Sequence, residues 1–208
     1  CFGEKSNCLM NKVPSTPTAD ISSETLKQWR QQIRERLINS RLAIGRQQRK
    51  DSQAILESQL LDVISKISPG ILGFYWLIKG EFDLRKLATE MIGRGWQAAL
   101  PAVMQKNSPL EFRNWTPEIK LEPGIWNIPV PKIRDVVSPS LLLVPLVGFD
   151  NEQYRLGYGG GYYDRTLVSF DVRPVTIGVG YKLGRLDTIY PQPHDIPMDN
   201  IIAVSPEE

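Results

Sequence analysis

The sequence has very little cysteine or histidine. Its two cysteines, Cys1 and Cys8, lie at the very start of the chain, and the single histidine is His194. A disulfide framework is therefore not expected, the body of the chain offers no thiol nucleophile, and a histidine-rich zinc site is excluded. A Ser-His-Asp mechanism would depend on His194 alone. We expect this residue to be packed or solvent-facing rather than a proton shuttle with Asp195.

Strong net charge and long apolar runs are also missing. The 208 residues carry a formal net charge of +2, which is too weak to indicate nucleic-acid binding by itself. No apolar run approaches the roughly 20 residues of a membrane span, and no signal-peptide core begins the chain. With 41% hydrophobic and 23% charged residues, the composition is typical of a globular protein. We expect a cytoplasmic protein with no nucleic-acid or membrane partner.

Two parts are expected along the chain. Residues 1–21 have no sustained hydrophobic period and contain Pro14 and Pro17, which predicts a flexible N-terminal arm. Residues 22–208 are expected to form a single domain. Its spacing predicts helices from Ser22 or Ser23 to about Gly45, and over 52–67, 83–93 and 162–170. Apolar runs predict strands at 71–78, 96–104, 141–149, 175–181 and 200–205.

Helices alternate with apolar strands, which predicts an α/β fold with a largely parallel sheet. In such sheets ligands bind beyond the carboxyl ends of the strands. Residues 109–132 are rich in proline and contain Trp115 and Trp126. Because tryptophan is costly to expose, we interpret this region as an ordered hairpin and loop.

The first predicted helix carries a stripe of cations. Lys27, Arg30, Arg34 and Arg41 lie beside the apolar face, with no acidic residue among them. One interpretation is the solvated flank of an amphipathic helix. The other is an anion-binding site, since four like charges would repel one another unless an anion lay among them.

The segment "RLGYGGGYYDR" (Arg155–Arg165) is the most unusual stretch. Its glycines read G-x-G-G-G, which is neither the dinucleotide pattern G-x-G-x-x-G nor a Walker A loop. Backbone N–H groups of such a loop, with a helix N-terminus after it, suit a phosphate. Arg155 could pair with that phosphate and Asp164 could hold magnesium beside it. Alternatively, the tyrosines fill core and Asp164 caps the helix.

The longer stretch "VPLVGFDNEQYRLGYGGGYYDRTL" (Val144–Leu167) resembles the signature of the 5-formyltetrahydrofolate cyclo-ligase family, with its core R-L-G-x-G-x-G-Y-Y-D. Four further segments resemble family motifs: "LKQWRQQIRERL" in the first helix, "GEFDL" (80–84), "GIWNIPVP" (124–131) and "PHDIPMDNII" (193–202). The resemblance covers nearly everything from about residue 24 onward. One departure is Gly160, where some members carry lysine.

The resemblance implies a three-layer α/β/α sandwich with a mainly parallel central sheet, like sugar-phosphate isomerases and CoA transferases. It also implies an enzyme of one-carbon metabolism that converts 5-formyltetrahydrofolate and ATP, with Mg²⁺, into 5,10-methenyltetrahydrofolate, ADP and phosphate through a phosphorylated formyl intermediate. Phosphoryl transfer asks mainly for positioning and charge stabilisation, which suits a chain without a thiol nucleophile. A non-catalytic folate or nucleotide binder of the same fold stays open as the alternative, and a nucleic-acid-binding module is a weaker one.

By the same resemblance, residues are assigned to each part of the reaction. The ATP-binding residues are Lys27, Arg30, Arg34, Arg155, Gly157, Tyr158, Gly159, Gly160, Gly161, Tyr162 and Tyr163, with Arg155 and Lys27 as the catalytic pair. The folate-binding residues are Trp76, Glu81, Trp126, Tyr162 and Tyr163. The magnesium ligands are Asp164 and Asp195. Glu81 would accept hydrogen bonds from pterin N–H groups while the aromatic rings stack on the pterin.

Overall fold

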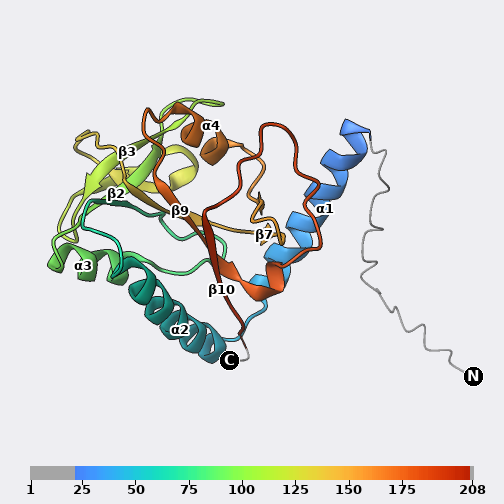
Figure 1. The fold of residues 1–208 in the computed structure, drawn as a ribbon, viewed down its shortest axis with the longest axis horizontal. Helices are drawn as coiled ribbons and strands as arrows, with labels where there is room; N and C mark the ends of the chain where they lie inside the picture. The colour runs from blue at the N-terminus through green and yellow to red at the C-terminus, as the bar shows by residue number, and fades with distance from the viewer. Residues whose placement is uncertain (1–21, 207–208) are drawn as a thin grey trace, which may run out of the picture.

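The computed structural model describes residues 22–206 (Figure 1), so the arm expected at 1–21 lies outside the described residues. Four α-helices form in this part of the chain: α1 (Ser23–Leu42), α2 (Arg46–Ile64), α3 (Arg85–Gly93) and α4 (Tyr162–Ser169). The first begins at Ser23, one of the two predicted starts, and Ser22 caps it because its hydroxyl accepts a hydrogen bond from the Thr25 N–H at 3.2 Å. None of the helices within residues 22–206 is long and apolar enough to cross a membrane.

A six-stranded sheet lies at the centre. Its order is β10 (Asn200–Val204), β9 (Val175–Tyr181), β6 (Leu141–Pro145), β1 (Ile71–Gly73), β2 (Gln97–Val103) and β3 (Leu110–Trp115). All neighbouring strands run parallel except β2 and β3. Two small hairpins flank the sheet, β4 (Leu121–Pro123) with β5 (Pro129–Pro131), and β7 (Gly148–Phe149) with β8 (Arg155–Leu156). The expected, mainly parallel sheet is therefore confirmed.

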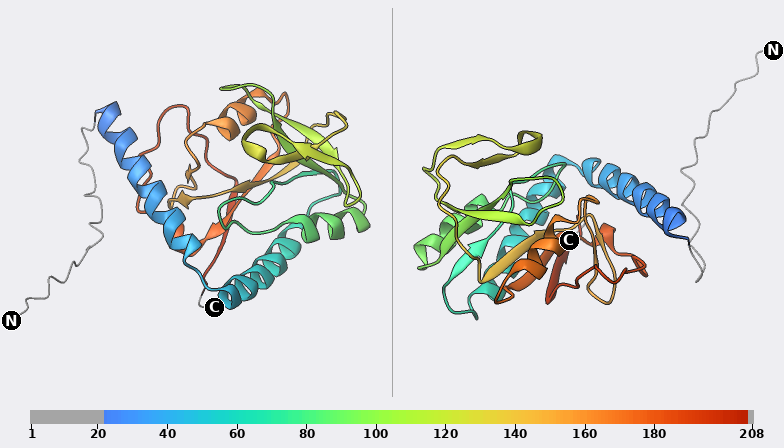
Figure 2. Two further views of the ribbon diagram at one scale, coloured as in Figure 1. Left: turned by 180° about the vertical axis from the view of Figure 1, so that it is seen from behind. Right: turned by 90° about the horizontal axis from the view of Figure 1, so that it is seen from above.

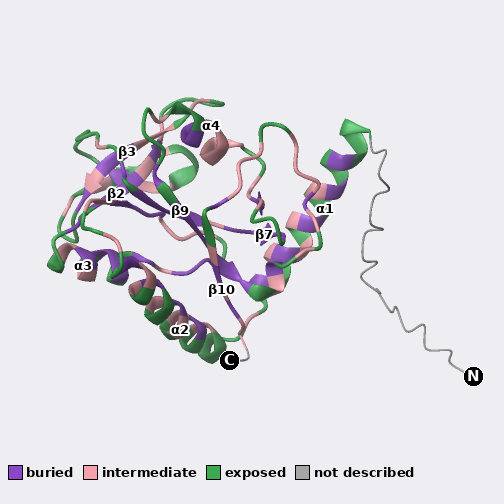
Figure 3. Ribbon diagram, in the orientation of Figure 1, coloured by how far each residue is buried: buried purple, intermediate pink, exposed green. Residues whose placement is uncertain are grey.

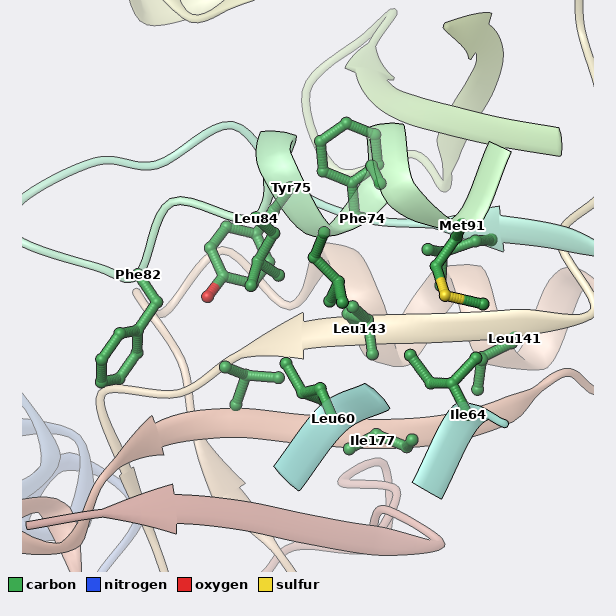
Figure 4. Packing of buried hydrophobic residues seen from close by; sticks show 14 of the residues in the cluster. Leu60, Ile64, Phe74, Tyr75, Phe82, Leu84, Met91, Leu141, Leu143 and Ile177 are labelled. Carbon is green, nitrogen blue, oxygen red and sulfur yellow. The ribbon is translucent and has the colours of Figure 1, made fainter. Parts of the chain in front are cut away.

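The strands are apolar throughout because both faces of the sheet are covered. Along β6, Leu141 and Leu143 pack with α2 and α3, whereas Leu142 and Val144 pack with Leu167 of α4. Figure 4 shows the first of these two clusters, in which Leu60 and Ile64 of α2 meet Leu141, Leu143 and Met91. Alternate residues of a buried parallel strand thus serve two layers, which explains the continuous apolar runs in the sequence. The result is the expected three-layer α/β/α arrangement, with α4 on the thinner side.

Helix α1 stands apart from these layers. It lies beside the end of the molecule that carries β7 (Figures 1 and 2), and its buried stripe faces the chain there (Figure 3). The stripe consists of Leu26, Trp29, Ile33 and Leu37, packed with Val147, Leu156 and Ile189. Val147 and Leu156 come after β6 in the chain, and Ile189 comes after β9. Helix α1 therefore covers the carboxyl-end side of the sheet.

The predicted strand 141–149 is split, since β6 ends at Pro145 and Gly148–Phe149 pair in a separate hairpin. Three further sequence expectations fail in detail. The run 71–78 forms a strand only at Ile71–Gly73, because the chain then leaves the sheet at its carboxyl end, while Phe74 and Tyr75 stay in the core. The second helix begins at Arg46 rather than Ser52, since Gly45 serves as its N-cap and donates its N–H to the Gln48 side chain. Its polar first turns carry no apolar period that could have revealed them.

The third failure concerns the tryptophans of 109–132. The region is an ordered hairpin as expected and Trp115 is buried, but Trp126 is 65% exposed. It lies at the tip between β4 and β5, where Trp126 and Asn127 both have positive φ. The tip therefore displays the indole instead of packing it.

Candidate active site

Most of the predicted site residues lie in or close to the glycine loop, between β8 and α4. This loop follows β6 through the β7–β8 hairpin, so it lies where a parallel sheet offers its ligand sites. Gly159 has φ +89° and Gly161, the N-cap of α4, has φ +63°. Both values belong to the left-handed region that a side chain disfavours, so these two positions require glycine.

The base of the loop is closed by an ion pair. Arg155 comes just before the loop and Asp164 lies in the first turn of α4, and the guanidinium and carboxylate are 2.9 Å apart. Both also bind the backbone of Ile196, since Arg155 donates to its carbonyl at 2.9 Å and Asp164 accepts from its N–H at 3.2 Å. The segment after Asp195 is thereby held against the loop.

The four cations of α1 have different surroundings. Lys27 is solvent-exposed and pairs loosely with Glu24 at 3.9 Å. Arg30 binds Asp195 at 2.7 Å and donates to the carbonyls of Ile189 and Tyr190. The stripe is therefore neither a uniformly solvated flank nor one continuous cationic surface.

Arg34 is the α1 cation that reaches the glycine loop itself. Its Nε donates to the Gly157 carbonyl at 2.7 Å, and a Cβ on Gly159 would lie 3.2 Å from its Cζ. Among residues 22–206, no hydrogen bond from either Nη atom of Arg34 is found. Burial, with the neighbouring Arg30 as a smaller cause, lowers the pKa of this guanidinium. A half-buried arginine thus lies over the loop with two nitrogen donors open to a ligand.

On the other side of the loop, Tyr158 connects to Glu81. The phenol donates to Glu81 Oε1 at 2.6 Å and accepts from Arg41 Nη2 at 2.6 Å. Glu81 Oε2 accepts from the Ile78 N–H at 2.9 Å. Although Tyr158 belongs to the glycine loop, its hydroxyl therefore points to the carboxylate assigned to folate and not to the phosphate side.

Glu81 lies in an enclosure rich in phenols. Burial raises the pKa of this carboxyl, while the Tyr158 hydroxyl, the Ile78 N–H, Arg41 and Lys79 oppose the rise. Burial, together with the charge of Glu81, also raises the pKa of Tyr75 and Tyr163. The Tyr75 hydroxyl is buried without a hydrogen-bond partner among residues 22–206, and it lies on the side of Phe82 in Figure 4. A buried hydroxyl of this kind suits a polar ligand, because buried donors are normally paired.

The aromatic residues assigned to folate are divided. Trp126 meets Tyr162 edge-to-face at 5.6 Å, and Arg165 lies over the Tyr162 ring. Tyr163 has the Arg155 guanidinium over its ring. Trp76 is half-buried under Arg85, which is bound to Asp83. The first three aromatics flank the start of α4, whereas no contact of Trp76 with that group is found in the described part of the chain.

No metal-binding cluster of three or more His, Cys, Asp or Glu side chains is found within residues 22–206. Asp164 and Asp195 each use one oxygen for an arginine and a backbone N–H, through Oδ1 in Asp164 and Oδ2 in Asp195. Within residues 22–206, His194 Nε2 lies 3.9 Å from Asp195 Oδ1, and no hydrogen bond or ion pair to Asp164 Oδ2 is found. Magnesium is commonly held by one or two carboxylates together with substrate phosphates. Asp164 and Asp195 form no cage for a metal by themselves, so an ion held by either carboxylate would have to arrive with phosphate ligands. The His194 side chain is exposed, as one of the sequence expectations had it.

Sequence reasoning missed the role of Arg41. It noted the positive charge, but the structure buries the side chain to 3% exposure and uses every nitrogen of its fork. The signal was present in the spacing, because Arg41 follows Leu37 by four residues and so continues the inward stripe of α1. Tyr75 was missed because it lies within an apolar run, where the hydrophobic pattern does not indicate the position or pairing of its hydroxyl.

Comparisons with known proteins agree on one family. The model of the 5-formyltetrahydrofolate cyclo-ligase family matches residues 26–204. A protein of Haemophilus influenzae named 5-formyltetrahydrofolate cyclo-ligase is 25% identical over 183 residues, covering 85% of this chain and 98% of its own. An Escherichia coli protein of the same name is 31% identical over 133 residues, covering 61% of this chain and 73% of its own.

Two solved structures have the same fold. The Aquifex aeolicus 5,10-methenyltetrahydrofolate synthetase superposes with a TM-score of 0.72 at 27% identity, covering 86% of this chain and 90% of that one. The Mycoplasma pneumoniae 5,10-methenyltetrahydrofolate synthetase gives a TM-score of 0.69 at 22% identity, covering 83% and 97%. The second likeness, at this identity, bears on the fold alone.

Proposed function

This chain belongs to the 5-formyltetrahydrofolate cyclo-ligase family, and from that premise we propose that it converts 5-formyltetrahydrofolate and ATP into 5,10-methenyltetrahydrofolate, ADP and phosphate. The formyl oxygen on N5 attacks the γ-phosphorus, and the bond to the ADP oxygen breaks. N10 then attacks the formyl carbon and loses its proton, and the oxygen leaves with the phosphate. Phosphorylation is needed because the formyl oxygen is otherwise a poor leaving group.

One observation supports the proposal: two neighbouring residues of the glycine loop contact the side chains that we assign to the phosphate and to the folate. The Gly157 carbonyl binds Arg34, whose Nη atoms are open to an anion, and the Tyr158 hydroxyl binds Glu81. A phosphate over the loop and a pterin at Glu81 would therefore be neighbours, as transfer between them requires. Catalysis of phosphoryl transfer rests mainly on such positioning and on charge stabilisation.

We assign the triphosphate to Arg34, Arg30, Arg155 and the N–H groups of the loop at Gly157, Tyr158, Gly159, Gly160 and Gly161. Without a lysine at Gly160, the cations of α1 carry more of the phosphate charge. Lys27 stays a prediction as a catalytic residue, since its ammonium must move from solvent to reach the loop. Arg155, bound to Asp164, acts from the base of the loop. The magnesium that accompanies ATP would be held at Asp164 and Asp195 and would neutralise phosphate charge.

We assign the folate to Glu81, Trp126, Tyr162 and Tyr163. The Glu81 carboxylate would accept hydrogen bonds from pterin N–H groups, and the exposed indole of Trp126 would cover the ring system beside Tyr162. Trp76 stays a prediction, supported only by its place in the segment that leads to Glu81. The cytoplasmic location expected from the sequence also stays a prediction.

The test is an assay of the purified chain with MgATP and 5-formyltetrahydrofolate. We expect the near-UV absorbance of the methenyl product to rise, with one ADP formed per product, and no rise when ATP is omitted or magnesium is chelated. Glu81→Gln is the matched variant, in which product formation should fall while the fold persists. Tight folate binding without product at high enzyme concentration would favour the non-catalytic binder instead.

A further inference from the structure

Arg41 ties together three segments at the candidate site. Its Nε donates to the Lys79 carbonyl at 3.0 Å, Nη1 to the Leu146 carbonyl at 3.1 Å, and Nη2 to the Tyr158 hydroxyl at 2.6 Å. These acceptors lie before Glu81, after β6 and in the glycine loop. A purely structural tie between α1 and the sheet would need the two carbonyls only. The third donor instead enters a chain of hydrogen bonds that ends on the Glu81 carboxylate.

Glu81 itself is presented by an unusual turn. Lys79 and Gly80 have φ +46° and +76°, so two consecutive residues adopt the left-handed region. Arg41 holds the carbonyl of the first, and Arg49 of α2 donates to the carbonyl of the second at 3.1 Å. The backbone that aims Glu81 is thus fixed by two arginines from outside it. Strained backbone of this kind persists only where its surroundings hold it.

We propose that Arg41 and Tyr158 are positioning residues for Glu81, with Arg41 fixing both the turn that carries the carboxylate and the phenol that binds its Oε1. The proposal rests on the proposed function for the identity of the ligand. Arg41 donates to the same oxygen through which Tyr158 donates onward, and consecutive hydrogen bonds of this kind strengthen one another. Tyr158 is therefore the point at which the glycine loop and the folate carboxylate are joined.

The proposal predicts how Glu81 titrates. The groups that face it are Tyr158 of the loop, Arg41 of α1, Lys79 of the turn, Tyr75 after β1 and Tyr163 of α4, with the Ile78 N–H. A hydroxyl that donates to a carboxylate favours its ionised form and so lowers its pKa. Removing the Tyr158 hydroxyl should therefore raise the pKa of Glu81 above its already raised value. Activity that needs the carboxylate would then be lost at a higher pH on the acid side.

The first experiment needs no ligand. The carboxyl carbons of glutamate are labelled with ¹³C, the Glu81 signal is identified by its loss in Glu81→Gln, and its titration is followed by NMR in the wild type and in Tyr158→Phe. We expect the midpoint to move to higher pH in Tyr158→Phe. The matched control is Tyr154→Phe, which removes a hydroxyl from the neighbouring hairpin and should leave the midpoint in place. An unmoved midpoint in Tyr158→Phe would overturn the proposal.

The second experiment separates the two substrates. In Tyr158→Phe and Arg41→Lys we expect the KM for 5-formyltetrahydrofolate to rise about tenfold or more, the scale of a lost hydrogen bond to a charged group, and the KM for ATP to change much less. Lysine keeps the charge of Arg41 but cannot reach all three acceptors. Arg36→Lys, on the same helix outside the network, is the control. Equal increases in both KM values, or a rise that follows loss of the folded state, would overturn the proposal.

The two experiments also distinguish this proposal from the proposed function. If the wild type forms no methenyl product but the Glu81 midpoint moves in Tyr158→Phe, the proposed function fails while the positioning network stands. If product forms and the midpoint does not move, the proposed function stands and the network fails.

Discussion

The guanidinium of Arg155 lies 2.9 Å from the carboxylate of Asp164, on opposite sides of the glycine loop in the sequence. Both side chains are largely buried, at 5% and 19% exposure. The cation that the sequence assigns to phosphate thus neutralises the carboxylate that it assigns to magnesium. With its base neutral, the loop must take most of its phosphate-binding charge from α1.

Replacing Asp164 tests what this pair does. Asp164→Asn leaves the buried Arg155 without its counter-ion, and breaking a buried pair from one side costs about 3 kcal/mol. We expect the free energy of unfolding to fall by about that amount and turnover to be lost, as measured by urea denaturation and by product formation. Asp171→Asn, an exposed aspartate just after α4, should change neither. If Asp164→Asn kept its free energy of unfolding but lost magnesium-dependent turnover, Asp164 would serve the metal and not the pairing with Arg155.

The cations of α1 make a second test, because their surroundings differ. Arg34→Lys keeps the charge but loses the fork that lies over the loop, so the KM for ATP should rise about tenfold or more while the KM for folate stays nearly constant. Lys27→Ala should leave the unfolding temperature unchanged, since that side chain is 77% exposed. Any rise in its KM for ATP then reports a phosphate contact. The control is Lys50→Ala, which replaces an exposed lysine of α2. If Lys27→Ala and Lys50→Ala have the same KM for ATP, Lys27 does not contact the phosphates.

Much of the fold could be predicted from the sequence because its signals are local. The run Val175–Tyr181 forms a strand with the predicted bounds, and the helix after the glycine loop ends one residue before Phe170, the last residue expected in it. The first helix begins at Ser23, one of the two starts that the sequence predicted. These elements depend on apolar period, capping and glycine, which are readable from neighbouring residues.

The contacts inside the site could not be read in this way. The pairing of Arg41 with Tyr158 joins residues that are 117 positions apart, and the hydrogen bond from Tyr158 to Glu81 spans 77. A single sequence carries no signal for such pairs. The family resemblance placed Tyr158 with the ATP-binding residues of the loop, and no feature of the sequence indicated that its hydroxyl contacts Glu81. The exposure of Trp126 was missed for a related reason, because composition does not tell a displayed indole from a packed one.

Two glycines of the loop offer a matched pair. Gly159 has φ +89° and a Cβ there would lie 3.2 Å from Arg34 Cζ, whereas a Cβ on Gly157 would meet nothing within 4 Å. Gly159→Ala should therefore lower the free energy of unfolding by about 1–2 kcal/mol, the cost of a side chain in the left-handed region. Gly157→Ala should lower it less, as measured by denaturation of both variants side by side. Equal losses would mean that backbone conformation does not set the requirement for glycine.

Trp126 separates ligand binding from stability most cleanly. Its indole is 65% exposed at the hairpin tip and meets Tyr162 edge-to-face at 5.6 Å, so it contributes little buried area to the folded state. Trp126→Ala should therefore change the free energy of unfolding by no more than about 0.5 kcal/mol, as is usual for surface positions. If the indole covers the pterin, the same variant should raise the KM for 5-formyltetrahydrofolate and lose part of the tryptophan fluorescence that the folate quenches.

The control for Trp126 is Ile133→Ala, which removes another exposed apolar side chain close to the same hairpin, 66% exposed. Both variants should unfold like the wild type, and only Trp126→Ala should weaken folate binding. Equal effects would assign the loss to a general change in the hairpin. An unchanged folate KM in Trp126→Ala would instead leave the tip as a displayed indole without a role in the pterin site. Either result would confine the folate site to Glu81 and the two tyrosines that begin α4.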